Sequence, residues 1–339
     1  MTETKNIRRA RIISTGSYVP DFVLTNDALS RMVDTSDEWI RERTGIGERR
    51  INTVTSNREM AKIAAQRALE ASGLSALDID LIIASTVSND NFTPSLACCV
   101  QSDIGAENAF AFDLNAGCSG FVYALDAASV YICAERPGAK PINNVLIVCS
   151  EVLSRITDYT DRSSCVLFGD GAGAAVVCAD TEHGLLSSYL RSDGTGAESI
   201  VANALIPVTD NGDGTVSNPT ESVKPGLRMN GRKVFTFAVR AIPEALKTAL
   251  EAAGVEASEL KYVVMHQANI RIIESAVERL GLAPEKAPVN IERYGNTSSA
   301  SVPILLDELN RAGKLERGDK LAIEGFGSGL TYGAAIIEW

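Results

Sequence analysis

One cysteine in this sequence stands where a protein would place a reactive thiol. Residues 109–124 read AFAFDLNAGCSGFVYA: a run typical of a buried strand, a turn of small residues, then helical spacing from Ser119. Cys118 is therefore predicted at the first turn of a helix, where unpaired backbone N–H groups and the helix dipole favour thiolate over thiol. A thiolate can take an acyl group from a thioester. A buried structural cysteine is the alternative that this stretch alone leaves open.

Two polar side chains in the second half of the chain could complete such a site. His266 ends a predicted strand over 262–265, and Asn296 follows Gly295 before a helix start rich in Ser and Thr. An imidazole N–H and an amide N–H together can stabilise the oxygen of an enolate, and backbone N–H groups of Cys118 and of the 327–329 loop can stabilise a tetrahedral intermediate. A core histidine, a helix cap and a plain hairpin are the structural alternatives.

Composition limits the class of protein. The 339 residues are 45% hydrophobic and 22% charged, which is enough for a large core. The net charge of −11 argues against nucleic-acid binding and requires an acidic partner to dock on a local basic patch. There is no apolar run of membrane-spanning length and no signal-peptide pattern at the start, so we expect a soluble, cytoplasmic protein that does not bind membranes. The seven cysteines are odd in number and form no CxxC, so neither disulfides nor a metal site is expected.

The elements that must position these residues alternate between strands and helices. Strands are predicted at 11–19, 81–86, 109–114, 144–150, 262–265, 321–324 and 331–339, with two more joined by a glycine-rich turn within 165–178. Helices are predicted to start at 25–26 and 34–39, and to cover 58–72, 94–104, a stretch from 119 onward, 271–281 and 299–312, while 193–227 reads as a long loop. Ligands in open α/β sheets bind beyond the carboxyl ends of strands, and Cys118, His266 and Asn296 all fall at such ends.

The second half of the chain repeats the first. ALEASG at 68–73 returns as ALEAAG at 249–254, and each copy is followed at the same distance by a strand. GAAVV at 173–177 returns as GAAII at 333–337. We therefore predict an α/β protein of two halves, 1–182 with the nucleophilic cysteine and 183–339 with the histidine and asparagine, related by duplication.

Seven stretches spread over almost the whole chain carry a family resemblance. They are STGSYVP at 14–20, MVDTSDEWIRERTGI at 32–46, CSGF at 118–121, TDRSSCVLFGDGAGAAV at 160–176, MHQANIRII at 265–273, YGNTSSASVP at 294–303 and GFGSGLTYGAA at 325–335. On these the chain resembles the β-ketoacyl-acyl-carrier-protein synthase III family, which are condensing enzymes with a thiolase-like fold. The resemblance implies that the two halves pack in a five-layered αβαβα arrangement.

The resemblance also implies an activity: decarboxylating Claisen condensation of a short acyl-CoA with malonyl-acyl-carrier protein, which gives 3-oxoacyl-acyl-carrier protein and initiates fatty-acid synthesis. Cys118 would carry the acyl group, His266 and Asn296 would promote decarboxylation, and the backbone N–H groups of Cys118 and Ser328 would form the oxyanion hole. No cofactor is implied beyond these substrates.

Further positions match binding residues of the family. The resemblance assigns Trp39, Arg43, Arg162 and Asn269 to coenzyme A, with the adenine held between Trp39 and Arg162. It assigns Arg271, with Arg232 and Lys233, to docking of the acidic acyl carrier protein, and Phe92 and Thr93 to an acyl pocket that reaches across the interface of a homodimer.

The chain differs from the family pattern at a few positions, and these differences bear on which acyl primer is used and not on the class of reaction. They lie at Thr93, at residues 115–117, at Ser328 and at Arg232. Chain length and branching of the primer stay open, as does the choice between fatty-acid synthesis and a secondary-metabolite pathway that condenses or transfers acyl groups. A non-catalytic partner subunit of the same fold is a third alternative, although such a chain would be expected to lack Cys118 or His266. A biosynthetic thiolase is disfavoured because no cysteine follows Cys178.

Overall fold

Two mixed β-sheets form the frame of the molecule. The computed structural model describes residues 8–135, 137–203, 209–210, 216–217 and 226–339. The first sheet has the strand order β1-β7-β6-β4-β5 and the second the order β13-β14-β15-β8. Their strands are β1 Arg9–Tyr18, β4 Leu81–Ser85, β5 Phe110–Leu114, β6 Asn144–Val152, β7 Asp170–Asp180, β8 Gly184–Ser192, β13 Leu260–Met265, β14 Lys320–Gly327 and β15 Thr331–Glu338.

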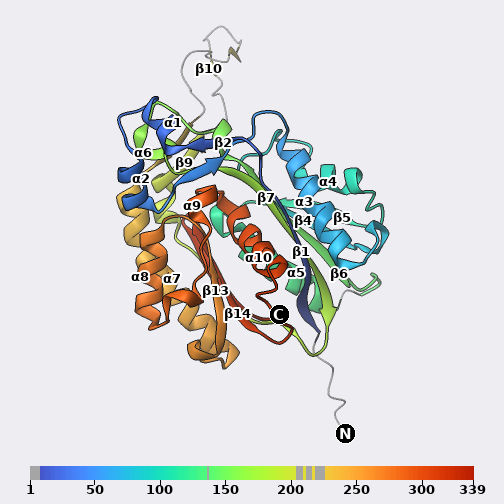
Figure 1. Cartoon of the computed structure of the whole chain (residues 1–339). Helices are drawn as coiled ribbons and strands as arrows, with labels where there is room; N and C mark the ends of the chain where they lie inside the picture. The colour runs from blue at the N-terminus through green and yellow to red at the C-terminus, as the bar shows by residue number, and fades with distance from the viewer. Residues whose placement is uncertain (1–7, 136, 204–208, 211–215, 218–225) are drawn as a thin grey trace.

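Helices cover both sheets and fill the space between them (Figure 1). Helices α5 and α10 lie between the two sheets, where their apolar faces share one large core with both. Helices α3 and α4 cover the outer face of the first sheet, and α7 and α8 cover that of the second. These helices are α3 Asn57–Ser72, α4 Leu96–Ile104, α5 Gly120–Cys133, α7 Gly231–Ala253, α8 Ile270–Leu280 and α10 Ser301–Arg311. The result is the five-layered αβαβα arrangement of a thiolase-like fold.

Shorter elements surround this frame. Helices α1 and α2 lie at the upper left of Figure 1, beside α6 and β9, and β2 of the antiparallel β2–β3 pair is close to them. The bounds are β2 Val23–Thr25, α1 Asn26–Ser30, α2 Asp37–Thr44, β3 Glu48–Arg50, α6 Arg162–Cys165 and α9 Ile291–Tyr294. The 3₁₀ turns that shape the site are η2 Gly117–Ser119 and η7 Ser298–Ala300. None of the helices in the described ranges is long and apolar enough to cross a membrane.

The two sheets pair their strands in the same pattern. In the first, β4 runs parallel to β6, which is antiparallel to β7, which is antiparallel to β1. In the second, β13 runs parallel to β14, which is antiparallel to β15, which is antiparallel to β8. The repeated segments at 81–85 and 262–265 form the equivalent strands β4 and β13. Those at 173–177 and 333–337 lie in the equivalent strands β7 and β15. This equivalence supports the proposal of two duplicated halves that meet at 182–183.

The prediction of two strands within 165–178 is wrong. Cys165 ends helix α6, and one continuous strand, β7, covers 170–180. The glycines here do not make a turn. A Cβ on Gly173 would lie 2.8 Å from the Pro303 side chain, and one on Gly171 would lie 2.9 Å from Ile304. These glycines therefore allow α10 to pack closely on the strand.

The segment 193–227 is not a plain loop. Residues 194–199 form a 3₁₀ helix, and β9 Ile200–Asn203 pairs with β12 Gly226–Met229. The short strands β10 Thr209–Asp210 and β11 Val216–Ser217 also pair with each other. The rest of the predicted loop lies outside the described residues.

Candidate active site

A cavity of about 880 Å³ opens between the two halves, and the predicted nucleophile and its two partners all line it. Cys118 comes from the first half, through turn η2 between β5 and α5. His266 follows β13, and Asn296 lies between α9 and η7, both in the second half. Three side chains that are up to 178 residues apart in the chain thus share one cavity.

Glycines bring the backbone of β14 against Cys118. A Cβ on Gly327 would lie 2.5 Å from the Cys118 backbone nitrogen, and one on Gly117 would lie 2.8 Å from the Ser328 nitrogen. Gly117 also has a φ of 55°, in the left-handed region that favours glycine. The backbone N–H groups of Cys118 and Ser328, assigned by resemblance to an oxyanion hole, are therefore neighbours at the cavity wall.

Cys118 is a thiol at rest, not the thiolate that its place near a helix start suggested. The side chain is half-buried, and burial raises its pKa to about 12. Its contact with the Ser298 hydroxyl lowers the pKa, while the Glu151 carboxylate raises it. Removal from water thus outweighs the stabilisation of charge at this helix start.

His266 is buried and neutral. It has 2% of its surface exposed, and burial lowers its pKa to about 3. Its Nδ1 lies 2.7 Å from the Ser301 hydroxyl, and its backbone N–H donates to the Glu324 carbonyl oxygen over 3.0 Å. The ring packs edge-on against Phe326, with centroids 5.3 Å apart. The second ring nitrogen, Nε2, is left for a ligand in the cavity.

Asn296 is held by its backbone and by one end of its amide. The backbone N–H donates to Leu167 O over 2.9 Å, and the backbone oxygen accepts from Gly169 N over 3.0 Å. Its Oδ1 accepts from the Ser298 N–H over 2.8 Å. Because the oxygen is occupied, the amide NH₂ is the group that Asn296 can offer to a ligand.

A buried carboxyl group that the sequence reasoning did not single out lies behind the cysteine. Glu151 accepts hydrogen bonds from Ser88 Oγ over 2.6 Å, from the Val87 N–H over 3.0 Å and from Ser299 Oγ over 2.7 Å. Burial raises its pKa. Glu151 thus joins the first half of the chain to the helix start that follows Asn296. The signal in the sequence was a lone acid in the apolar strand at 144–152.

Three of the four predicted coenzyme A residues line the outer cavity: Trp39, Arg43 and Asn269. The Arg162 guanidinium carbon lies 4.5 Å from the centre of the Trp39 ring, so the fourth residue stacks on the first. An adenine between them would require roughly 7 Å, two van der Waals spacings. The pair would therefore have to separate to hold an adenine. Asn269 donates to Arg43 O over 3.0 Å and caps helix α8.

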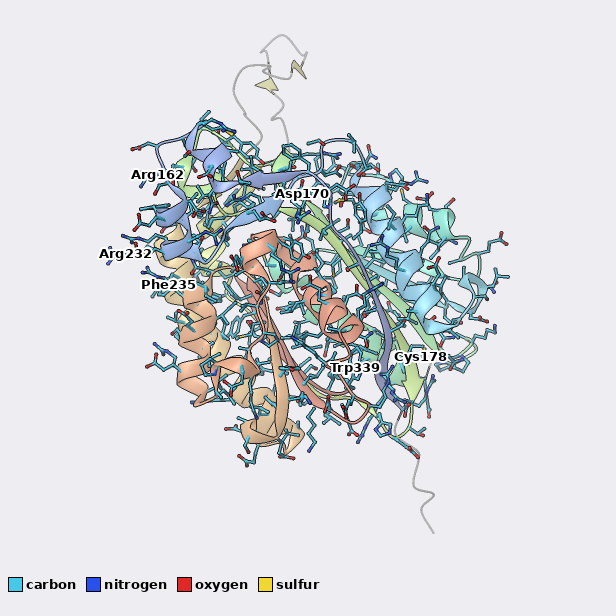
Figure 2. All side chains as sticks on the ribbon, viewed as in Figure 1. Arg162, Asp170, Cys178, Arg232, Phe235 and Trp339 are labelled. Atoms are coloured by element: carbon cyan, nitrogen blue, oxygen red, sulfur yellow. The ribbon has the colours of Figure 1, made fainter. Side chains whose placement is uncertain are left out.

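Basic side chains assigned to carrier-protein docking lie around the mouth of this cavity. Arg271 lies in the first turn of α8 and Arg232 in the first turn of α7; both are exposed and both line the cavity. Lys233 is exposed beside Arg232 but does not line it. Figure 2 shows Arg162, Arg232 and Phe235 on one edge of the molecule. A local basic surface thus exists on a chain whose net charge is −11.

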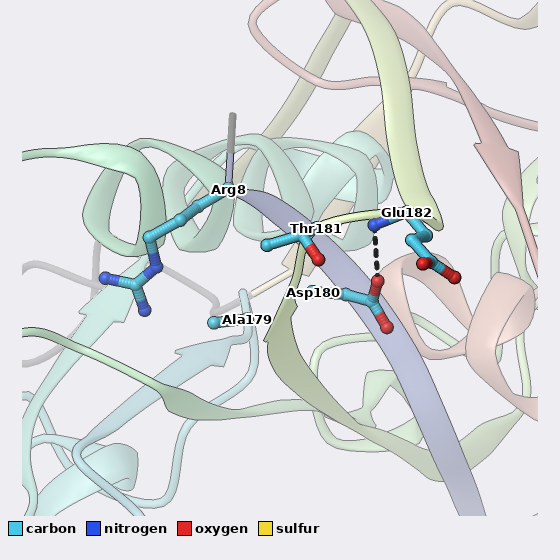
Figure 3. A pocket seen from close by; sticks show the side chains of 5 residues that line it. All are labelled: Arg8, Ala179, Asp180, Thr181 and Glu182. Atoms are coloured by element: carbon cyan, nitrogen blue, oxygen red, sulfur yellow. Dashed lines mark hydrogen bonds between the residues drawn. The ribbon is translucent and has the colours of Figure 1, made fainter. Parts of the chain in front are cut away.

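Phe92 and Thr93 lie apart from this cavity. Both are exposed, Phe92 by 78%, and neither is among the residues that line the cavity in this single chain. A smaller hollow of about 380 Å³ forms where β1 begins and β7 ends, lined by Arg8 and residues 179–182 (Figure 3). It contains none of the residues predicted for catalysis or substrate binding.

Known proteins match the chain over nearly its whole length. Residues 112–194 match the family model described as 3-oxoacyl-[acyl-carrier-protein (ACP)] synthase III, and residues 250–339 match its C-terminal model. The beta-ketoacyl-[acyl-carrier-protein] synthase III of Clostridium acetobutylicum is 46% identical, over 97% of this chain and 98% of that protein.

Solved structures agree with this assignment. The 3-oxoacyl-[acyl-carrier-protein] synthase III of Aquifex aeolicus superposes with a TM-score of 0.87 at 42% identity, over 97% of this chain and all of that one. The priming beta-ketosynthase of the R1128 polyketide pathway has the same TM-score at 37% identity, over 98% of this chain and 97% of that one. Fold, cavity and similarity together show that this chain belongs to the β-ketoacyl-[acyl-carrier-protein] synthase III family.

Proposed function

We propose that this condensing enzyme joins a short acyl group from acyl-CoA to the two-carbon unit of malonyl-acyl-carrier protein through an acyl-Cys118 intermediate. The observation that carries the proposal is the meeting of Cys118, His266 and Asn296 in one cavity. The product is 3-oxoacyl-acyl-carrier protein, the first condensation product of fatty-acid synthesis. No group beyond these substrates enters the scheme.

The first half-reaction is transfer of the acyl group. The Cys118 sulfur attacks the thioester carbonyl carbon, the bond from that carbon to the coenzyme A sulfur breaks, and the proton lost by Cys118 ends on coenzyme A. Because Cys118 is a thiol at rest, its deprotonation is part of this step and not a precondition. The backbone N–H groups of Cys118 and Ser328 would stabilise the tetrahedral oxyanion.

The second half-reaction is decarboxylation and condensation. The bond between the malonyl carboxylate and Cα breaks, CO₂ leaves, and the electron pair becomes an enolate whose oxygen would accept hydrogen bonds from His266 and Asn296. The enolate carbon then attacks the acyl-Cys118 carbonyl, and Cys118 leaves as a thiolate that takes up a proton. A histidine with a pKa of about 3 stays neutral throughout, so it donates a hydrogen bond without adding a charge to the site.

The exposed surface around the cavity supports the choice of partners. The Trp39–Arg162 stack and Arg43 would bind the adenine and phosphates of acyl-CoA, and Asn269 its pantetheine arm. Arg271, Arg232 and Lys233 would dock the acidic acyl carrier protein, since opposite charges steer such an encounter. We also propose a homodimer: β5 is an edge strand of its sheet, and the exposed Phe92 and Thr93 lie just before α4, which packs on β5.

Intact-protein mass spectrometry tests the proposal and identifies the primer. The protein would be incubated with acetyl-, isobutyryl-, hexanoyl-, octanoyl- and benzoyl-CoA in turn. We expect one acyl adduct, absent in Cys118→Ala, and release of CO₂ when malonyl-acyl-carrier protein is added. No adduct with any acyl-CoA or acyl-carrier-protein thioester would favour a non-catalytic subunit.

The similarity to a polyketide priming ketosynthase makes a secondary pathway the second candidate. A strong preference for an unusual primer, such as a long or aromatic acyl group, would favour it.

A further inference from the structure

The hydrogen bonds of one buried hydroxyl determine which nitrogen of His266 carries the proton. Ser301 begins α10 and is 2% exposed. Its Oγ lies 2.7 Å from His266 Nδ1 and accepts a hydrogen bond from the Gln267 backbone N–H over 3.3 Å. These are its two partners among the described residues.

The backbone N–H of Gln267 can only donate, so the Ser301 oxygen must accept there. A hydroxyl has one hydrogen to give. If His266 carried its proton on Nδ1, Ser301 would accept from both neighbours, and its own buried hydrogen would have no acceptor within the described chain. If Nδ1 is unprotonated, Ser301 donates to it and every group is paired. Because unpaired buried donors are costly, the second arrangement is the stable one.

The tautomer of His266 decides whether its ring offers a hydrogen-bond donor or an acceptor to the cavity. A neutral imidazole with an unprotonated Nδ1 carries its hydrogen on Nε2, the nitrogen left for a ligand. Edge-on packing against Phe326 restricts rotation of the ring that would exchange the two nitrogens. A donor at Nε2 is what an enolate oxygen requires, whereas an unprotonated Nε2 would repel that oxygen.

We propose that Ser301 is a positioning residue that holds His266 in the Nε2–H tautomer and so makes it a hydrogen-bond donor to the reacting oxygen. The assignment of the tautomer stands on the hydrogen bonds alone. Its kinetic consequence rests on the proposed function, in which His266 acts only in the decarboxylating half-reaction.

Nitrogen NMR of ¹⁵N-histidine-labelled protein tests the tautomer directly. The chain has only two histidines, so His183→Asn leaves a single imidazole, that of His266. We expect a protonated Nε2 and an unprotonated Nδ1 in this background, and a mixture of both tautomers once Ser301→Ala is added. A protonated Nδ1 in the single-histidine protein, or an unchanged spectrum after Ser301→Ala, would overturn the proposal.

Kinetics of the separated half-reactions test the consequence. Ser301→Ala should slow decarboxylation of malonyl-acyl-carrier protein on the order of tenfold and leave acylation of Cys118 by acyl-CoA unchanged. Ser301→Thr keeps a hydroxyl and should restore most of the rate. The matched control is Ser14→Ala, which removes an equally buried hydroxyl that donates to Ala68 O over 2.7 Å on the far side of the first sheet. Equal losses in both half-reactions, or in Ser14→Ala, would show that Ser301 is only structural.

The two proposals fail separately. Wild-type protein that forms no acyl adduct would refute the proposed function while the NMR spectra still decided the tautomer. A tautomer shift in Ser301→Ala without any loss of decarboxylation would instead refute the link from Ser301 to the reaction.

Discussion

Ser298 donates its backbone N–H to Asn296 Oδ1 over 2.8 Å, from a backbone with a φ of 51°. Among the described residues it is the one non-glycine with a positive φ, a conformation that costs energy unless the surroundings enforce it. Its effect is to orient the Asn296 amide with the oxygen engaged and the NH₂ left for a ligand. The same short segment carries Ser301, which binds His266 Nδ1. Residues 296–301 thus orient the two side chains, Asn296 and His266, that offer hydrogen-bond donors to the cavity.

The orientation of Asn296 leads to the first prediction. Asn296→Asp keeps the shape but loses the NH₂ donor and adds a negative charge beside the developing enolate. We expect decarboxylation to fall at least about a hundred- to a thousand-fold, with acylation of Cys118 retained. Single-turnover measurement of CO₂ release and mass spectrometry of the acyl-enzyme separate the two steps. Asn108→Asp, on an exposed turn, is the control for the added charge. Full condensation by Asn296→Asp would be incompatible with the role given to Asn296.

His266 should be essential for decarboxylation and dispensable for acylation. His266→Ala is expected to form the acyl-enzyme and then to stop, while His183→Ala, which alters the only other histidine, should behave as wild type. Because burial lowers the pKa of His266 to about 3, its charge does not change near neutral pH. The decarboxylation rate should therefore show no histidine titration between pH 5 and pH 8. A limb with an apparent pKa near 6.5 that disappears in His266→Ala would contradict the neutral assignment.

Cys118 should alkylate slowly in the empty site. Burial raises the pKa of the thiol to about 12, so the thiolate fraction keeps rising with pH up to that value. We expect the rate of iodoacetamide labelling at Cys118, followed by peptide mass spectrometry, to increase without a plateau to pH 10. The exposed Cys98 in the same sample serves as an internal reference. A plateau at Cys118 below pH 8 would show that the helix start outweighs burial after all.

Substitutions in the carrier-protein docking residues and in the coenzyme A residues should affect different ligands. Arg271→Glu is expected to weaken acyl carrier protein binding at least about tenfold, because it places a like charge against an acidic partner. Its effect on the KM for acyl-CoA should be smaller. Arg279→Glu is the matched control, since it makes the same change in the last turn of the same helix. Trp39→Ala should show the reverse pattern, with a raised KM for acyl-CoA and unchanged carrier-protein affinity. Equal losses for both ligands in Arg271→Glu would remove the docking assignment.

A buried carboxyl group outside the mechanism should limit stability at high pH. Glu324 in β14 is fully buried, and neither carboxyl oxygen has a hydrogen-bond partner among the described residues. Burial raises its pKa well above the ordinary value. The folded state therefore keeps this proton while the unfolded chain releases it, so stability falls as the pH rises above the unfolded pKa of about 4.5.

Replacement of the Glu324 carboxyl group by an amide should remove this loss of stability at high pH. We expect Glu324→Gln to raise the melting temperature by about 2–4 °C at pH 8, with a smaller gain at pH 5. Thermal unfolding of both proteins across this range checks the sign. A gain that is larger at pH 5 than at pH 8 would mean that Glu324 is ionised in the folded protein.

The sequence alone predicted most of the secondary structure, the family and the three central residues of the site. The apolar runs and cap residues predicted most strands and helices, because period and capping are local properties of the chain. Long distinctive stretches indicated the family, and the repeated segments indicated two equivalent sheets. Cys118 and His266 were predicted together because each follows a strand in an α/β pattern. The same position was expected of Asn296 and is wrong: Asn296 follows the short helix α9, and its backbone reaches the site through hydrogen bonds to Leu167 and Gly169.

Tertiary structure decided what depends on residues far apart in the chain. The glycines of β7 looked like a turn because the helix that packs on them, α10, follows more than a hundred residues later. The pKa of Cys118 is raised, and not lowered as its place near a helix start suggested, because residues from both halves of the chain exclude water from the thiol. Ser301 and Glu151 were missed for the same reason, since their partners, His266 and Ser299, are neighbours only after folding. Hydrogen-bond pairing and desolvation are properties of packed surroundings, and the folded chain alone supplies those.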